Sequence, residues 1–161
     1  MERLIIMEKY FRIVNLLIPN QLESDQMKLR LSKINEQPEI YIKDNSRMIT
    51  KSDDYLWLAM VDLLIDNGYA FEIDWKENYK TAEDCINNLF KKYKIFLELH
   101  IDVDEETDPE EFFRIANREL EKLGNYRIYL IDINSDSYVF TVGKLDSVQE
   151  LQFLDKRISI F

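Results

Sequence analysis

The most continuous apolar pattern in the chain runs from Tyr55 to Ile65, where almost every position carries an apolar side chain. A helix that is apolar around most of its circumference is usually buried by more than one neighbour. Ser52 precedes this run as a candidate N-cap, with Asp53 and Asp54 in the first turn, and Gly68 follows where a left-handed residue commonly ends a helix. The pattern therefore predicts a buried helix that Gly68 closes.

The stretch from Tyr69 to Trp75 alternates between apolar and polar residues, as expected of a strand with one buried face. Phe71, Ile73 and Trp75 belong to the face expected to join the core. Glu72 and Asp74 belong to the opposite face, which is expected to be partly exposed. The helix, the glycine turn and the strand are therefore expected to form the centre of the hydrophobic core.

Upstream of this stretch, the chain is expected to be mainly helical. Apolar residues at steps of three and four predict a helix from Glu2 to Ile18, which Pro19 ends because the residue before a proline avoids helical angles. Residues 22–35 fit a helix or a strand, and the helix is preferred because Ser24 and Asp25 resemble start signals. A short strand over 40–43 and a loop over 43–51 complete this part.

Downstream, helical and strand patterns alternate, and residues 126–133 are apolar on both faces, as is typical of a central strand. The expected elements are a helix capped by Thr81, a strand over 95–103, a helix from the N-cap Asp108 and Pro109 to Leu123, a strand over 126–133, its hairpin partner over 138–142, and a last helix over 145–158 capped by Asp146 or Ser147.

These elements predict one α+β domain over residues 1–161, with a mixed or antiparallel sheet of about three to five strands flanked by about five helices. Residues 1–51 are expected to form a helical part packed on a core made by residues 52–161.

Composition limits the functions that this chain can have. Of its 161 residues, 46% are apolar and 32% are charged, which is typical of a globular protein. Three glycines leave no room for a glycine-rich phosphate loop, and the single cysteine, Cys85, excludes an internal disulfide and a cysteine-based zinc cluster. No apolar run approaches the ~20 residues that span a bilayer, and no signal-peptide layout is present, so a cytoplasmic protein is expected.

The net charge of −10 is unevenly distributed along the chain. Residues 1–51 carry 9 Lys and Arg against 7 Asp and Glu, whereas the remaining residues carry 12 against 24. Such a surface repels nucleic acid and anionic membranes, and it suits a basic protein partner. The alternative is that the acidic surface serves solubility alone.

The chain contains few side chains that commonly act in catalysis or metal binding, with one cysteine and one histidine. Cys85 lies on the apolar stripe of its expected helix, which favours a buried thiol over a reactive one. His100 is the sole histidine, and without a second histidine or a nucleophile a structural or surface role is expected. Residues 98–111 contain 8 carboxylates and no Lys or Arg, but Thr107 and Phe113 stand where a calcium loop requires Gly and Glu. No cofactor is expected.

Two short stretches stand out from ordinary packing patterns, namely DWK at residues 74–76 and IDINSDSYVF at residues 131–140. They are preceded by WLAMVDLLIDNG and by FFRIANRELEKLGNYRIYLID, respectively. Together they resemble a family of small uncharacterised bacterial proteins, a domain of unknown function that pairs a DWK-type strand end with an IDxxSDSYxF hairpin. The resemblance covers roughly residues 56–142. It implies a cytosolic bacterial protein and supplies no activity.

The candidate binding residues lie at strand ends and turns, where sites on α+β folds often gather. They are Glu72, Asp74, Trp75, Lys76, Asp132, Asp136 and Tyr138. If the two strands are neighbours, Asp74, Asp132 and Asp136 could converge on a divalent cation. The alternative is that Asp132 and Asp136 bond to turn amides and that Asp74 and Lys76 form a surface pair.

Three functions follow from these observations. The acidic charge and the missing catalytic set favour a non-enzymatic interaction module, such as an immunity or antitoxin protein that neutralises a basic toxin. The second hypothesis is an enzyme that binds a small ligand or a divalent metal through Asp74, Asp132, Asp136 and His100. The third is a structural homo-oligomer that associates through the helix of residues 2–18.

Overall fold

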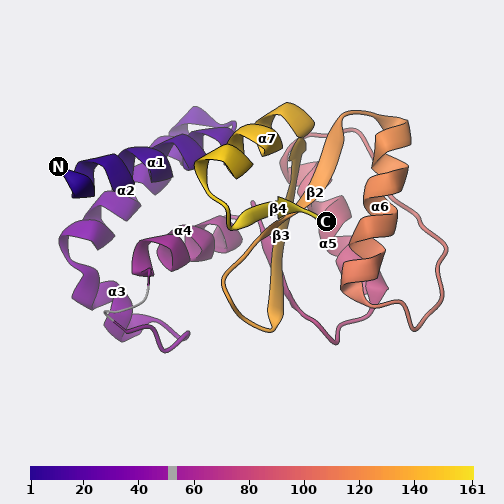
Figure 1. Ribbon diagram of the computed structural model, residues 1–161, viewed down its shortest axis with the longest axis horizontal. Coiled ribbons are helices and arrows are strands. Elements are labelled where there is room, and N and C mark those ends of the chain that lie inside the picture. Colours follow the sequence, from indigo (N-terminus) through magenta and orange to yellow (C-terminus); the bar gives the residue numbers. More distant parts are fainter. Residues whose placement is uncertain (51–53) are drawn as a thin grey trace. The chain divides into compact units, whose positions relative to one another are not determined.

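The computed structural model describes residues 1–50 and 54–161 (Figure 1). These residues form seven helices and a four-stranded antiparallel sheet, which confirms the predicted α+β class.

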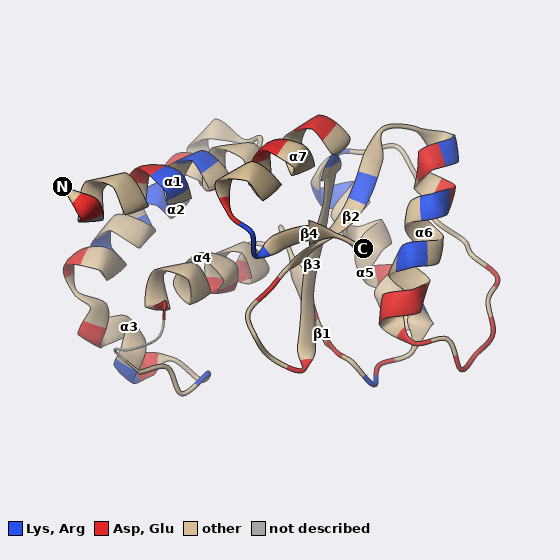
Figure 2. Cartoon of the chain, viewed as in Figure 1, with Lys and Arg blue, Asp and Glu red and all other residues tan. Residues whose placement is uncertain are grey.

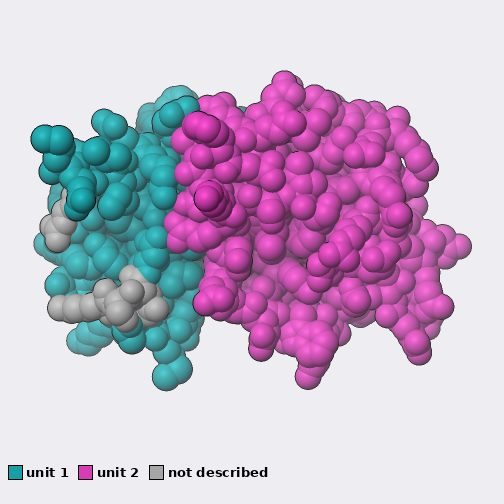
Figure 3. Space-filling view, viewed as in Figure 1, with its two compact units in different colours: residues 1–67 teal, residues 68–161 magenta. Residues whose placement is uncertain are grey.

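The chain divides into two compact units, residues 1–67 and residues 68–161 (Figure 3). The packing of residues 1–51 on the remainder of the chain stays a prediction. None of the helices within the described residues is long and apolar enough to cross a membrane.

All the regular elements in the described residues of the first unit are helices. They are α1 (Glu2–Leu17), α2 (Gln21–Glu36), α3 (Pro38–Asp44) and α4 (Tyr55–Asp66). The helix α2 contacts α1, α3 and α4. The preferred helix over 22–35 is confirmed, but it begins at Gln21, because the Asn20 side chain accepts a hydrogen bond from the Glu23 amide at 3.0 Å. Ser24, expected to mark the start, is instead buried and donates to Asn15 Oδ1 at 2.9 Å, which joins α2 to α1.

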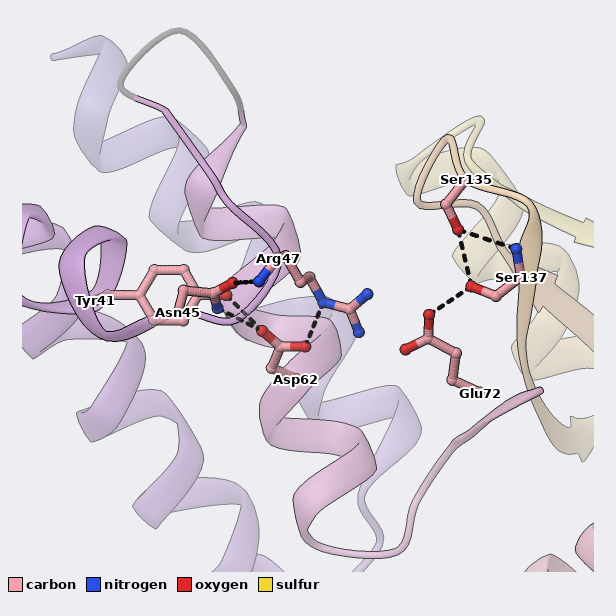
Figure 4. A network of polar contacts seen from close by, with 7 residues as sticks. All are labelled: Tyr41, Asn45, Arg47, Asp62, Glu72, Ser135 and Ser137. Carbon is pink, nitrogen blue, oxygen red and sulfur yellow. Dashed lines mark hydrogen bonds and ion pairs between the residues drawn. The ribbon is translucent and has the colours of Figure 1, made fainter. Parts of the chain in front are cut away.

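The prediction of a short strand over 40–43 is wrong, because these residues belong to α3. Pro38 occupies the first turn of this helix, where its missing N–H has no cost. The segment is then held by Asp62 of α4, whose carboxylate accepts hydrogen bonds from the Tyr41 hydroxyl at 2.6 Å and from Asn45 Nδ2 at 3.0 Å (Figure 4). Arg47 Nε donates to the other oxygen of Asp62 at 2.8 Å. These three bonds fasten α3 and the following loop to α4.

The buried helix predicted in the middle of the sequence is confirmed as α4. Leu56, Trp57, Met60 and Leu64 are among its buried residues. Its N-cap is Asp54, whose side chain accepts from the Trp57 amide at 3.2 Å, while Ser52 and Asp53 lie outside the described residues. Gly68 adopts a φ of 77°, as predicted for the residue that ends the helix.

The second unit contains the sheet, in the order β1-β3-β2-β4. Its elements are β1 (Phe71–Asp74), α5 (Tyr79–Lys92), α6 (Pro109–Leu123), β2 (Tyr126–Ile131), β3 (Ser137–Lys144), α7 (Leu145–Leu154) and β4 (Ile158–Ile160). The predicted central strand is confirmed as β2, which pairs with β3 on one side and with β4 on the other. The strand β1 pairs with β3, so the helix-turn-strand stretch supplies an edge of the sheet and not its centre.

Helices cover both faces of this sheet (Figure 1). On one face, Ile73, Ile128, Phe140 and Val142 form a cluster with residues of α5 and α6, including Phe90, Phe112 and Phe113. On the other face, α7 contacts β2 and β3, and a Cβ on Gly143 would lie 3.5 Å from Val148 Cγ2 of α7. The side chain of Asn117, which is 5% exposed, lies between α6 and β2 and bonds to both backbone groups of Ile128.

Three helix boundaries in this unit differ from the predictions. The N-cap of α5 is Asn78 and not Thr81, because Asn78 Oδ1 accepts from the Thr81 amide at 3.0 Å. The N-cap of α7 is Lys144, so Asp146 and Ser147 lie inside the helix. The last helix ends at Leu154 and not at Ile158, because Asp155 bonds to Arg157 in a turn and residues 158–160 pair with β2. In α6, the predicted cap is confirmed, since Asp108 Oδ1 accepts from the Glu111 amide at 2.8 Å and Pro109 follows it.

Candidate functional site

The predicted binding residues gather mainly at one end of the sheet. In the β1–β3 register, Asp74 lies opposite Ser137, so the end of β1 is beside the turn that joins β2 to β3. This turn contains Asp132 and Asp136. The two strand ends on which the site prediction depended are therefore neighbours.

A small polar cluster links β1 to this turn (Figure 4). Ser137 Oγ donates a short hydrogen bond to the Glu72 carboxylate. The hydroxyls of Ser135 and Ser137 are 2.8 Å apart, and the Ser137 amide donates to Ser135 Oγ at 3.1 Å. Because β1 and β3 are paired, the Glu72 carboxylate and the Ser137 hydroxyl lie on the same face of the sheet, and Ser135 contacts Ser137 from the turn. Ser135 and Ser137 were not among the predicted binding residues.

The aspartates at this end make local bonds. Asp74 Oδ1 accepts from the Lys76 amide at 2.8 Å, and Asp132 Oδ1 accepts from the Asn134 amide at 2.7 Å. Both bonds span two residues and stabilise turns. For Asp132 this is the alternative raised by the sequence, whereas Asp74 bonds to the backbone amide of Lys76. Within residues 1–50 and 54–161, no three His, Cys, Asp or Glu side chains are placed to hold a metal ion. The geometry therefore gives no support to a shared cation between Asp74, Asp132 and Asp136.

Trp75 is 49% exposed, so its assignment to the core face is wrong. Strand pairing ends at Asp74, and Trp75 belongs to the turn that follows. The Lys76 ammonium lies 5.1 Å from the centre of the exposed Trp75 ring, which is a cation–π arrangement. Aromatic side chains such as tryptophan are enriched at protein–protein interfaces.

Tyr138 does not join this group. It lies opposite Ile73 on the face covered by α5 and α6, and its hydroxyl donates to Glu110 Oε2 at 3.2 Å. Burial, followed by the nearby Glu110 carboxylate, raises the pKa of Tyr138. Its ring makes edge contacts with Phe113 and Phe161. Its role in the described residues is packing between the sheet and α6.

A second surface lies on the segment between α5 and α6. The predicted strand over 95–103 is wrong, because these residues pair with no strand. The alternation that motivated the prediction nevertheless describes their burial. Every second residue packs on the core of α5 and α6, and the residues between them are exposed. We call the exposed set, Phe96, Glu98, His100, Asp102 and Asp104, the outward row.

Side chains of α5 hold this segment in place of a neighbouring strand. Asn87 Oδ1 accepts from the Leu99 amide at 2.8 Å, and Asn87 Nδ2 donates to the Leu99 carbonyl at 3.0 Å. Glu83 Oε2 accepts from the Ile101 amide at 2.9 Å. The outward row is therefore fastened to α5 at its middle, and its side chains face solvent in a regular order.

The ends of the outward row differ in chemistry. Phe96 is 99% exposed. His100 is also exposed, with its Nε2 at 3.2 Å from Glu98 and its Nδ1 at 3.8 Å from Glu83, which agrees with the expected surface role. From Asp102 to Asp108 the segment adds acidic residues and no basic ones (Figure 2). The sequence signal for this surface was the alternation combined with the acidic run.

Cys85 is partly buried on the α5 side of the core, and burial, helped by Asp84 and Glu77, raises the pKa of its thiol to about 11. At pH 8, its thiolate fraction is then about 100-fold below that of a thiol with the ordinary pKa. We expect the folded protein to react with a disulfide reagent such as DTNB about 100-fold more slowly than the chain unfolded in urea. Equal rates in the two states would contradict the burial of this thiol.

A family model of a domain of unknown function, DUF6630, matches residues 9–160. Comparisons with curated proteins and with solved structures give no match. The matched span covers most of both compact units and includes both surfaces described above. The expectation of an uncharacterised domain family is therefore confirmed, and the chain belongs to the DUF6630 family.

Proposed function

We propose that this protein is a non-enzymatic module that binds a basic protein partner, in the manner of an immunity or antitoxin protein. The observation that carries the proposal is the outward row, an ordered line of exposed acidic side chains that begins with an almost completely exposed phenylalanine. A cytoplasmic bacterial location, which the family resemblance implies, belongs to the same proposal.

The geometry of the outward row suits such a role. Charges on a held segment are already in position for a partner, so less conformational entropy is lost when the complex forms. Carboxylates steer a basic partner and select its orientation, and an exposed aromatic ring supplies apolar contact area at the centre of an interface. Phe96 provides the aromatic ring, and Glu98, Asp102 and Asp104 provide the carboxylates, all on the segment between α5 and α6.

The end of the sheet is the second candidate surface for the same partner. Trp75 is exposed there, and the turn residue Asp136 is exposed beside the end of β1. Its carboxylates are partly engaged in turn bonds, since Asp74 and Asp132 accept from backbone amides. We therefore rank it below the outward row.

The test uses the product of the neighbouring gene, measured by titration calorimetry at about 50 mM and about 300 mM salt. The triple variant Glu98→Gln, Asp102→Asn, Asp104→Asn is expected to weaken binding at least about tenfold at low salt and to reduce the salt dependence. Asp104→Asn keeps the oxygen that accepts from the Glu106 amide, so the turn is retained. Phe96→Ala is expected to weaken binding while leaving the salt dependence unchanged.

A matched control removes the same charge elsewhere through Asp66→Asn, Asp146→Asn and Glu150→Gln, all at exposed positions. This control is expected to bind within about twofold of the unmodified protein. If Asp74→Asn with Asp136→Asn weakens binding while the outward-row variant does not, the partner binds at the end of the sheet. If no basic neighbour product binds at low salt, the proposed function is wrong.

One observation favours the homo-oligomer as an alternative. Leu4 and Ile5 of α1 are 70% and 61% exposed, so part of the apolar stripe of this helix is not covered. Light scattering on the same samples tests this hypothesis. A monomer at high concentration excludes it, whereas a dimer that Leu4→Gln dissociates supports it.

A further inference from the structure

A groove lies between α6 and the end of β4. It has a volume of about 450 Å³, within the range of small-molecule sites. Three arginines line it, namely Arg114 and Arg118 from α6 and Arg127 from β2. Ile160 and Phe161 supply an apolar wall.

The groove exists because β4 is shorter than β2. The strand β4 pairs only with residues 129–131, which leaves the outer edge of β2 without a strand partner from Tyr126 to Ile128. Side chains occupy this edge instead. Asn117 bonds to the amide and the carbonyl of Ile128, and Arg127 Nη1 donates to the Tyr126 carbonyl at 2.7 Å. Arginine and amide groups therefore stand where a strand would continue.

The three guanidinium groups retain hydrogen-bonding capacity. A guanidinium carries five N–H donors, and an ion pair uses one or two of them. Arg118 lies 3.8 Å from Glu111, which is too long for a hydrogen bond, and Arg127 Nη2 lies 3.3 Å from Glu121. Arg114 makes its short contact with Glu110, which is not among the groove residues. Each arginine can thus bind an oxyanion without losing its carboxylate neighbour.

Charge favours a small anion over a polymer. The side chains lining the groove include three arginines and two glutamates, Glu111 and Glu121, which leaves one positive charge in excess among these side chains. The unit as a whole carries 12 Lys and Arg against 20 Asp and Glu in residues 68–161, which repels an extended polyanion. Alternating blue and red bands on α6 in Figure 2 show how closely the positive groups are framed by negative ones.

We propose that this groove binds a small organic oxyanion, a carboxylate or a phosphate monoester, whose apolar part packs on Ile160 and Phe161. Planar guanidinium groups match the geometry of both oxyanions, and the fixed Arg127 provides a preorganised partner. The inference is independent of the proposed partner surface, because the groove includes no residue of the outward row.

The test titrates the full chain with phenyl phosphate, benzoate and inorganic phosphate, followed by two-dimensional NMR and by calorimetry. Saturable binding of phenyl phosphate or benzoate is expected, with shifts at the amides of Ile160 and Phe161, and the stronger of the two identifies the oxyanion. Arg118→Gln and Arg114→Gln, both at exposed positions, are each expected to weaken binding about tenfold. Lys122→Gln removes the same charge from α6 outside the groove, and it is expected to change binding less than twofold.

Three results would overturn the proposal. The first is the absence of saturable binding of either aromatic anion at concentrations up to about 5 mM, the range of weak small-ligand affinities. The second is an equal loss in Lys122→Gln and Arg118→Gln, which would indicate unspecific charge attraction. The third is equal affinity for inorganic phosphate and phenyl phosphate, which would show that the apolar wall of Ile160 and Phe161 does not contribute to binding. Thermal unfolding of each variant checks that its fold is retained.

Discussion

Replacing Asn117 with alanine is expected to lower the free energy of unfolding by about 3 kcal/mol. Asn117 Oδ1 accepts from the Ile128 amide at 2.7 Å, and its Nδ2 donates to the Ile128 carbonyl at 2.9 Å. A weaker bond of 3.4 Å reaches the Phe161 carbonyl. Alanine leaves the two buried backbone groups of Ile128 without these partners, and each unsatisfied group costs about 1–3 kcal/mol.

Urea unfolding followed by circular dichroism measures this change. Asn117→Leu restores the volume but not the bonds, so we expect a loss of similar size. Asn125→Ala removes an exposed amide that bonds to Asp146 at 3.2 Å, and it is expected to cost less than about 0.5 kcal/mol. A loss in Asn117→Ala as small as that of Asn125→Ala would show that β2 does not depend on this side chain.

Replacing Asp62 with alanine is expected to lower the free energy of unfolding by about 2–3 kcal/mol. Its carboxylate accepts from the Tyr41 hydroxyl, Asn45 Nδ2 and Arg47 Nε within 3.0 Å. Hydrogen bonds to charged groups contribute more than neutral ones, and the Tyr41 hydroxyl is half-buried. Burial, followed by its bond to Asp62, raises the pKa of Tyr41, so this hydroxyl remains a donor throughout the neutral range.

The effect of the Asp62 variant is also local, because the lost bonds fasten α3 and its loop to α4. Limited trypsin digestion is expected to cut the Asp62→Ala protein faster after Lys43 and Arg47, with the sites identified by mass spectrometry. Asp62→Asn keeps one acceptor oxygen and is expected to cost about 1 kcal/mol. Asp66→Ala, one turn further on α4 and exposed, serves as the control. Unchanged cleavage in Asp62→Ala would contradict this role.

Local sequence signals predicted the elements that are stabilised within themselves. The helix of residues 55–66 ends before Gly68, whose φ of 77° suits a residue without a side chain. Asp108 and Pro109 begin α6, because a carboxylate cap and a proline both satisfy the first turn of a helix. Pro38 and Glu39 form a similar helix-start signal at the beginning of α3. The prediction of a strand over 40–43 did not take this signal into account.

The candidate site was predictable only in part. The adjacency of β1 and the β2–β3 turn made Asp74 and Asp136 neighbours in the fold, which was the condition for a shared site. The faces of the residues were less predictable, because strand pairing ended at Asp74 and left Trp75 exposed. Tyr138 alternates onto the face covered by α6, away from Glu72. No local sequence pattern indicates the groove at Arg127, because its arginines come from α6 and β2, which are brought together only by packing.

The sequence by itself determined the α+β class, most helices, the central hairpin and the acidic character of the segment after α5. Those features depend on the spacing and charge of residues that are close in sequence, so they can be read directly from the sequence. Only the tertiary structure decided whether an alternating segment becomes a strand. Residues 95–103 alternate, but Asn87 and Glu83 take the backbone bonds that a strand would have made. Residues 158–160 become a strand because β2 has an open edge beside them. A strand needs a partner, and a partner is a property of the fold.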